Sequence, residues 1–477
     1  MTVPRLEESM IPLCVNLEGA LVRTDLEWEM VFGALKKQRW LLLLFPFLLL
    51  LGKHRLLRLL ARRVEIDVTT LPYTEELLTY LRQRRIAGQP IILVAALPLA
   101  QARAVSDHIG IFKDVISFSG TAGIEERQRG LIERYGAGGF DYAGTRASDA
   151  RLWQSARIPI LVNTPPSLVR RIGATRNPGI LLAPRALRLR TILLSMRPDQ
   201  WVKNLLLFIP VLAAHRMNSA PMLADSALAF VAFSLAASSN YLFNDLFDLA
   251  SDRNHPRKRH RPLAAAEISL PCALTTGPLL LLASLIPASR LPVGFLMWLA
   301  LYLAIAWVYS LMLRQYVLLD VVALACLYTI RVAAGGSATG IRLSFWLLAI
   351  CLFIFTSLAL AKRCSELINT PSAGAIAKSG RDYDLRDLNS LSVMGVASGY
   401  MAILVIALYV NSPETAALYS HPMVLWFLCP LTLFWISRLW ILVGRGQVED
   451  DPVAFALRDA VSLVVVVASL LTLLAAL

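Results

Sequence analysis

The sequence is poor in charge. Asp, Glu, Lys and Arg supply only 17% of its 477 residues, whereas hydrophobic residues supply 56%. In soluble domains about a quarter of the residues are charged, so this composition excludes an ordinary soluble enzyme, a disordered chain and a coiled coil. Because so much apolar surface can be buried only where lipid replaces water, the sequence indicates a membrane protein.

Paired cysteines are also missing. The six cysteines show neither CxxC spacing nor a histidine pair nearby, so we expect no disulfide framework and no zinc site. The first ten residues are polar and acidic and lack the apolar stretch of a secretory signal peptide. We therefore expect the amino terminus to stay in the cytoplasm.

Basic residues exceed acidic ones mainly in the first part of the chain. Residues 1–190 contain 27 Lys and Arg against 17 Asp and Glu, and the remaining 287 residues contain 20 against 16. No nucleic-acid-binding motif accompanies this charge, which favours docking to an anionic membrane surface, or simple solvation, over nucleic acid. We expect no nucleic-acid partner.

From about residue 192 onward, apolar runs recur at about the 20 helical residues that cross a bilayer. The loops after even-numbered runs hold fourteen Lys and Arg, and the opposite loops hold three. Because basic loops stay in the cytoplasm, we predict a multi-pass inner-membrane protein whose amino-terminal domain and polar loops are cytoplasmic. Nine spans are predicted: 200–215, 222–244, 272–288, 293–311, 317–334, 343–361, 393–411, 422–442 and 459–477.

The region before these spans alternates short β-rich runs such as IPLCV and IILVA with helical stretches. This pattern is typical of an α/β domain with a parallel sheet. The predicted organisation is an α/β domain over residues 1–165, a linker over 166–191 and a membrane domain over 192–477. Residues 40–52, WLLLLFPFLLLLG, have basic flanks and are short for a span. They are either an interfacial or re-entrant element or a buried helix of an inserted cap.

Four polar residues at the end of the second predicted span suggest a metal site. Asn244, Asp245, Asp248 and Asp252 follow one another at i, i+1, i+4 and i+8, which puts the three carboxylates within about 60° of each other on a helix. Acids clustered beside a membrane repel each other unless a cation binds among them. Mg²⁺ prefers oxygen ligands completed by substrate phosphates, so we predict a Mg²⁺-diphosphate site.

A basic loop follows these acids directly. Cations in this loop would hold phosphate oxygens and stabilise a departing diphosphate. The alternative is a solvated helix end whose basic loop only reflects membrane orientation, but that leaves three acids on one face unexplained. The basic residues are Arg253, Arg257, Lys258, Arg259 and Arg261.

The sequence NDLFDLASD resembles the NDxxDxxxD signature on the second of nine helices in the UbiA superfamily of intramembrane prenyltransferases. The resemblance covers residues 190–477. It implies a fold of nine transmembrane helices and a Mg²⁺-dependent transferase whose cavity opens toward cytoplasm and lipid. Its expected substrates are a polyprenyl phosphate or diphosphate and a polar or aromatic co-substrate.

Two further segments, RPDQWVKN and HPRKRHRPLAA, look more like phosphoribosyl diphosphate:polyprenyl-phosphate phosphoribosyltransferases than like aromatic prenyltransferases. The aromatic branch carries a DxxxD-type run after the sixth helix, where this chain has AKRCSEL. This departure favours phosphoribosyl transfer onto polyprenyl phosphate. Prenylation of a hydroxybenzoate-type acceptor is the alternative enzyme, and a polyprenyl-phosphate carrier or flippase is the non-enzymatic one.

The resemblance assigns roles to the polar residues of the transferase region. Asp245, Asp248 and Asp252 are expected to hold the metal, and Asn244 to orient them. Two roles are considered for Glu366. It either contacts the metal or the substrate, or it forms a purely structural ion pair with Lys362. The expected phosphate- and substrate-binding set adds Lys203, Asn204, Lys362, Arg363 and Glu366 to the basic loop.

Two more charges lie in the fifth predicted span. Asp320 and Arg331 are about 16 Å apart by helical rise, too far to pair directly. An intramembrane charge is a functional candidate, so both are expected to line the cavity, with structural pairing to other residues as the alternative.

Residues 10–165 look like the haloacid dehalogenase superfamily, whose phosphatases carry a DxDGT motif after the first strand. This chain has NLEGA there. Asn16 replaces the attacking carboxylate and Glu18 the proton-handling acid, and an amide is a poor nucleophile. Asp149 is what remains of the acidic fourth motif. The resemblance therefore implies an inactive phosphatase domain.

Overall fold

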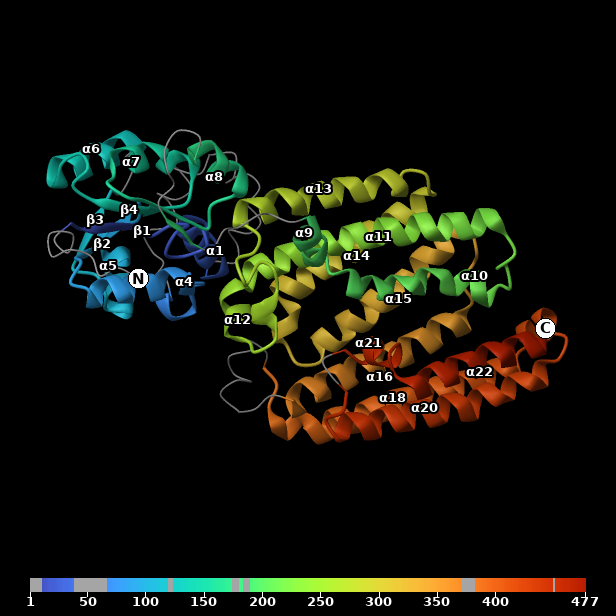
Figure 1. Ribbon diagram of the computed structural model, residues 1–477. Helices are drawn as coiled ribbons and strands as arrows, with labels where there is room; N and C mark the ends of the chain where they lie inside the picture. The colour runs from blue at the N-terminus through green and yellow to red at the C-terminus, as the bar shows by residue number, and fades with distance from the viewer. Residues whose placement is uncertain are drawn as a thin grey trace. The chain divides into compact units, whose positions relative to one another are not determined.

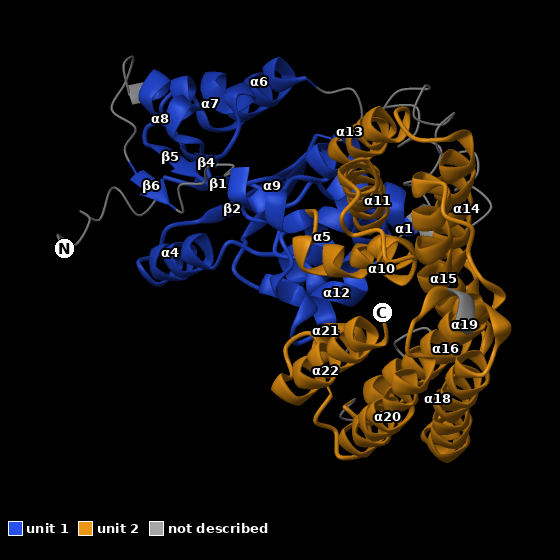
Figure 2. Ribbon diagram, turned by 90° about the vertical axis from the view of Figure 1, so that its right-hand side faces the viewer, with its two compact units in different colours: residues 1–195, 242–275 blue, residues 196–241, 276–477 orange. Residues whose placement is uncertain are grey.

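The computed structural model describes residues 11–37, 67–118, 123–173, 180–182, 189–369, 382–448 and 451–477. Residues 40–52 lie outside these ranges. The described chain forms two compact units (Figure 2): residues 1–195 with 242–275, and residues 196–241 with 276–477.

The first unit contains a six-stranded, fully parallel sheet in the order β3-β2-β1-β4-β5-β6. This agrees with the predicted α/β domain. The sixth strand lies beyond residue 165, so the sheet continues into the region where the sequence suggested a linker. The strands are β1 Leu13–Asn16, β2 Ile91–Ala95, β3 Asp114–Ser117, β4 Asp141–Gly144, β5 Pro159–Val162 and β6 Ile180–Leu182.

Helices cover both faces of this sheet (Figure 1). Successive strand residues point to opposite faces, so Leu13 and Val15 join the core beneath α1, α4 and α5, whereas Cys14 joins the core beneath α6 and α7. Strands buried on both sides read as continuous apolar runs, which is why they were recognisable in the sequence. The helices are α1 Leu26–Lys37, α4 Glu75–Ile86, α5 Leu99–Ile109, α6 Ile124–Tyr135, α7 Ala150–Ser155, α8 Pro166–Gly173 and α9 Leu189–Ser195.

The second unit is helical. Seven helical segments of the described chain are long and apolar enough to cross a membrane, and a shorter apolar helix, α22, follows them. The seven include two that begin with a 3₁₀ turn, Leu385–Val410 and Pro422–Gly444. The helices are α11 Ala220–Phe247, α13 Leu270–Ala288, α14 Val293–Leu311, α15 Leu319–Thr339, α16 Phe345–Ile368, α18 Leu388–Val410, α20 Leu428–Gly444 and α22 Ala460–Ala476, with the short helices α10 Ile209–Ala213, α19 Pro413–Leu418 and α21 Pro452–Ala456. The ends of α11 and α13, together with α12 Leu249–Asn254, belong to the first unit.

The first predicted span, 200–215, is not a long helix. It consists of a 3₁₀ helix, Pro198–Phe208, followed by the five-residue α10 with Pro210 near its start. Each of the other eight predicted spans coincides with a helix. Only seven of the described helical segments are long and apolar enough to cross a membrane, so the number of nine crossings remains a prediction.

α15 is the most buried of the seven long apolar helices, because 72% of its most apolar stretch lies inside the protein. At Gly335 the backbone comes so close to the 3₁₀ helix Pro198–Phe208 that an added Cβ would lie 2.2 Å from the Leu207 carbonyl oxygen. Only a residue without a side chain fits this contact.

We therefore expect Gly335→Ala to lower the thermal unfolding temperature of the purified protein, because overpacking against backbone costs about 1–3 kcal/mol or more. Gly444→Ala is the matched control, since its added Cβ meets nothing within 4 Å. Equal unfolding temperatures for the two variants would contradict the close approach. Differential scanning fluorimetry in detergent measures both.

Candidate functional site

The aspartate motif lies where α11 ends. The sequence suggested one helix through all three acids, but α11 stops at Phe247 and α12 begins at Leu249, with Asp248 between them at φ −95° and ψ 8°. Hydrogen bonds from Asp248 N to the Asn244 carbonyl (2.9 Å) and from Asp252 N to the Asp248 carbonyl (2.8 Å) continue across the joint. The helical spacing of the outer acids is therefore kept despite the break.

Arg261 joins the two outer acids of the motif. Its Nη1 lies 3.3 Å from Asp245 Oδ1 and 2.6 Å from Asp252 Oδ2, so both carboxylates face one point. Their side chains are only 7% and 5% exposed, and that of Arg261 is 29% exposed. Two buried acids beside one another need a cation between them, and here a guanidinium supplies it.

The rest of the basic loop turns at His255. Because Pro256 follows, His255 is extended and ends α12 at Asn254. Lys258 begins a short 3₁₀ helix, Lys258–His260, and Arg257 and Arg259 are exposed. Arg253 differs from them, since its side chain is only 6% exposed and pairs with Glu29 of α1.

Within the described residues, no group of three or more His, Cys, Asp or Glu side chains is close enough to enclose a metal. The motif does fit Mg²⁺ in another way. Mg²⁺ is usually held by one or two carboxylates and completed by water and substrate phosphates. Asp245 and Asp252 supply two convergent carboxylates already gathered around a positive group, with Asp248 between them in sequence.

In the second unit, a buried ion network surrounds Arg363 of α16. Its Nε lies 2.5 Å from Asp320 Oδ2, its Nη2 donates to the Tyr309 hydroxyl (2.8 Å), and its Nη1 contacts Glu366. The Tyr383 hydroxyl donates to Asp320 (2.5 Å). Asp320 thus takes Arg363 as a partner, and Glu366 pairs with the same guanidinium at i+3.

A second network surrounds Arg331. Its Nε donates to Asn204 Oδ1 (2.8 Å) and its Nη2 to the Tyr302 hydroxyl (3.1 Å), while the Asn204 amide donates to Ser234 (3.0 Å). Arg331 is 4% exposed and Asn204 1%. Asn204 therefore holds a buried guanidinium rather than presenting a free amide.

Lys203 pairs with Asp451, a residue that the sequence analysis missed. Asp451 caps α21, accepting from Val453 N (3.0 Å), and the Asp-Pro pair that starts this helix was the available signal. Burial raises the pKa of Asp451, but the charges of Lys203 and Lys362 outweigh burial and keep that pKa below its ordinary value. Lys203, Lys362 and Asp451 thus form one electrostatically coupled group.

In the α/β unit, Asn16 ends the central strand β1 and is 3% exposed, and its Oδ1 accepts no hydrogen bond from the described residues. Glu18 accepts from Ala96 N after β2 (3.1 Å). Asp149 accepts from Thr145 N (2.8 Å) and Arg146 N (3.0 Å) after β4. Glu18 and Asp149 therefore bind the protein's own backbone near the carboxyl ends of the strands.

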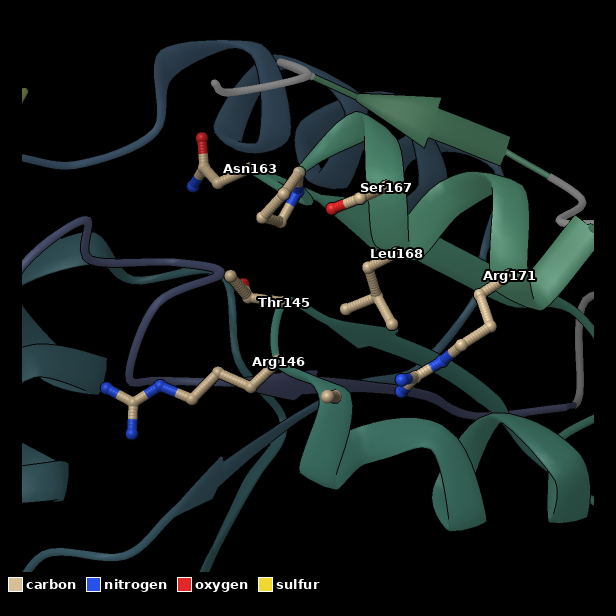
Figure 3. Close-up of a pocket in the computed structure, with 8 residues that line it drawn as sticks. Thr145, Arg146, Asn163, Ser167, Leu168 and Arg171 are labelled. Carbon is tan, nitrogen blue, oxygen red and sulfur yellow. The ribbon is translucent and has the colours of Figure 1, made fainter. Parts of the chain in front are cut away.

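A cavity of about 600 Å³ opens at the same sheet edge (Figure 3). Thr145 follows β4 and Asn163 follows β5, while Ser167 and Leu168 come from α8. Its lining comprises Thr145, Arg146, Ala147, Asn163, Pro165, Ser167, Leu168 and Arg171.

Glu18 gives the α/β unit a pH dependence that can be measured. Burial raises its pKa from 4.5 to about 7, with Glu27 adding to this rise and Arg127 opposing it. Because the neutral form is favoured in the folded state, Glu18 stabilises the fold fully below pH 4.5, and this contribution is lost as the pH rises through about 7.

We expect Glu18→Gln to gain stability relative to the unaltered protein as the pH rises from 4.5 to 8, by about 3 kcal/mol at most. Calorimetry of the full-length protein in detergent across this range tests it. Glu76→Gln, at an exposed position of α4, should leave the pH profile unchanged. Parallel profiles for the unaltered protein and Glu18→Gln would refute the raised pKa.

Several known proteins are similar to this chain. Protein y4nM of Sinorhizobium fredii is 31% identical over 95% of this chain and 88% of its own length. Nodulation protein NoeC of Azorhizobium caulinodans is 34% identical over 57% of this chain and 88% of its own. Decaprenyl-phosphate phosphoribosyltransferase of Mycobacterium tuberculosis is 34% identical over 59% and 92%.

Among solved structures, a UbiA homolog from Archaeoglobus fulgidus bound to DMAPP and Mg²⁺ aligns with a TM-score of 0.44 at 18% identity, covering 58% of this chain and 96% of that chain. The model of the UbiA prenyltransferase family matches residues 205–463, more than half of the chain. Together with the seven long apolar helices, this match identifies an integral membrane protein. The chain belongs to the UbiA prenyltransferase family.

Proposed function

We propose that this protein transfers a phosphoribosyl group from phosphoribosyl diphosphate to a polyprenyl phosphate, with release of diphosphate and dependence on Mg²⁺. The relatives named decaprenyl-phosphate phosphoribosyltransferase support this assignment, since their similarity extends over 86% and 92% of the Mycolicibacterium smegmatis and Mycobacterium tuberculosis proteins. The reaction would take place at the cytoplasmic side of the inner membrane, because the loops rich in Lys and Arg are expected to lie on that side.

The observation that carries this choice is the state of Glu366. In the sequence, Glu366 is the nearest carboxylate at the position of the second acidic signature, and Arg363 already binds it. Lys362 adjoins Arg363 in the sequence, and the charge of Lys203 interacts with that of Lys362. The basic wall formed by Lys203, Lys362 and Arg363 also contains their acidic partners Asp451, Asp320 and Glu366. Its cations suit an acceptor that carries its own phosphate, whereas a neutral aromatic acceptor has no use for them.

In the proposed reaction, a phosphate oxygen of the lipid attacks the anomeric carbon of the ribose. The bond from this carbon to the diphosphate breaks, and its electron pair leaves with the diphosphate. Asp245, Asp248 and Asp252 would hold Mg²⁺, which neutralises charge on the leaving group when bound. Arg257, Lys258, Arg259 and Arg261 would bind phosphate oxygens, and Lys203 and Lys362 would orient the lipid phosphate.

The test is a product assay. Protein in nanodiscs, supplied with Mg²⁺, phosphoribosyl diphosphate and labelled polyprenyl phosphate, should form a labelled phosphoribosyl lipid, and EDTA should abolish the product. Polyprenyl diphosphate with a hydroxybenzoate should give none. A prenylated aromatic product instead, or lipid transport without any new covalent product, would overturn the assignment.

We further propose that the α/β unit does not hydrolyse phosphate esters. Asn16 stands at the end of the central strand where a haloacid dehalogenase phosphatase has its nucleophile, and an amide cannot attack phosphorus effectively. Full-length protein should release no phosphate from a generic ester above the level of Asp149→Asn, and a clear difference between the two would refute this.

A further inference from the structure

Helix α1 of the α/β unit uses two of its faces. Leu26 and Met30, one turn apart, are buried in the core beneath the sheet. Glu29 and Phe32, three residues apart, instead contact the segment that carries the aspartate motif. One helix thus connects the sheet core of the first unit to residues 242–275 of the same unit.

The polar contact is a forked ion pair. Arg253 Nη1 lies 3.0 Å from Glu29 Oε2, and Nη2 lies 2.7 Å from Glu29 Oε1. The third nitrogen, Nε, donates to the Ala264 carbonyl (3.2 Å). The side chains are 6% and 12% exposed, so loss of one partner leaves a buried charge uncompensated. The fork fixes orientation as well as distance.

The apolar contact lies inside the motif, directly before Asp248. Phe32 and Phe247 meet edge to face, with ring centroids 6.0 Å apart and an interplanar angle of 76°. Phe247 immediately precedes Asp248, and Arg253 immediately follows Asp252. The two contacts therefore bracket residues 248–252, where the backbone leaves α11 and enters α12.

The coverage of the relatives indicates that this support is an addition to the transferase. The Mycobacterium tuberculosis enzyme aligns over 92% of its length with only 59% of this chain. Its remaining 8% is too short to contain a counterpart of the six-stranded sheet. Protein y4nM, by contrast, aligns with 95% of this chain.

We propose that Glu29 is a positioning residue of the transferase site, and that the α/β unit is an internal support that holds residues 248–252 in the geometry that binds Mg²⁺. The expected change in the Mg²⁺ dependence of the rate rests on the proposed function, whereas the expected change in hydrogen exchange does not. Glu29 acts through Arg253 and does not touch substrate. The unit thereby has a role that needs no phosphatase chemistry.

The experiment uses the full-length protein in nanodiscs and compares Glu29→Gln with Glu76→Gln, an exposed acid of the same unit. Hydrogen exchange followed by mass spectrometry should show the amides of α12 exchanging about tenfold faster in Glu29→Gln. The Mg²⁺ concentration giving half-maximal activity should rise about tenfold, with KM for the lipid unchanged. Glu76→Gln should match the unaltered protein in all three.

A second variant guards against misfolding. Phe32→Leu keeps the fork but removes the ring contact, and should raise the Mg²⁺ midpoint by a smaller factor. Unchanged exchange in α12 for Glu29→Gln overturns the proposal, as does a loss of maximal rate at an unchanged Mg²⁺ midpoint. If the unaltered protein makes no phosphoribosyl lipid, the proposed function fails, while the exchange measurement still decides whether α1 supports the motif.

Discussion

Asp252→Asn should lower the transferase rate by about 10²–10³-fold, the scale on which loss of one charge-stabilising group acts in a transition state. The substitution keeps the shape of the side chain and removes its charge. Asp252 is 4% exposed and shares a guanidinium with Asp245, so an amide there leaves Asp245 and Asp248 as the two remaining carboxylates proposed to hold the metal. The initial rate of phosphoribosyl-lipid formation at saturating Mg²⁺ is the measurement.

Asp225→Asn is the matched control for this prediction. Asp225 lies on the same helix, α11, about five turns before the motif, so the change of charge is the same but the site is different. Its rate should equal that of the unaltered protein. Full activity of Asp252→Asn would show that Asp252 is not a metal ligand and would contradict the magnesium assignment.

The local parts of this molecule were predictable from the sequence. Four of the six strands, β1, β2, β3 and β5, coincide with short β-rich runs of the sequence, and eight of the nine predicted spans coincide with helices, because burial on both faces of a sheet, or in lipid, leaves an unbroken apolar pattern. Family membership followed from one motif, and the match over residues 205–463 confirms it.

The failures have physical causes. The segment 200–215 is apolar on average, but Pro198 and Pro210 favour short 3₁₀ and α turns, and Lys203 and Asn204 find buried polar partners there. Asp248 leaves helical geometry while its hydrogen bonds continue, which periodicity alone does not reveal.

Ion-pair partners that lie far apart along the chain could not be predicted from the sequence. Glu29 and Arg253 are 224 positions apart, and Lys203 and Asp451 are 248 positions apart. No spacing rule links such residues, because only the folded backbone brings them together. The charges themselves were visible as candidates, since a buried or intramembrane charge needs a partner. The structure identifies each partner.

Asp320→Ala should cause the largest loss of stability in the second unit. Asp320 is fully buried and Arg363 is 1% exposed. Removal of the carboxylate takes one ion-pair partner from the buried Arg363 guanidinium, which still contacts Glu366 and Tyr309. It also deprives the Tyr383 hydroxyl of its acceptor. Breaking one side of a buried ion pair costs about 3–5 kcal/mol. We expect a lower unfolding temperature and a reduced yield of folded protein in detergent.

The paired replacement Asp320→Leu with Arg363→Met separates stability from activity. Exchanging a whole buried pair for apolar side chains of similar volume is often neutral or stabilising, so the double variant should regain most of the unfolding temperature lost in Asp320→Ala. The double variant should nevertheless lack transferase activity, because no guanidinium is left to hold Glu366 in the basic wall proposed for the lipid phosphate. A double variant that is both stable and fully active would show that the network only stabilises the fold.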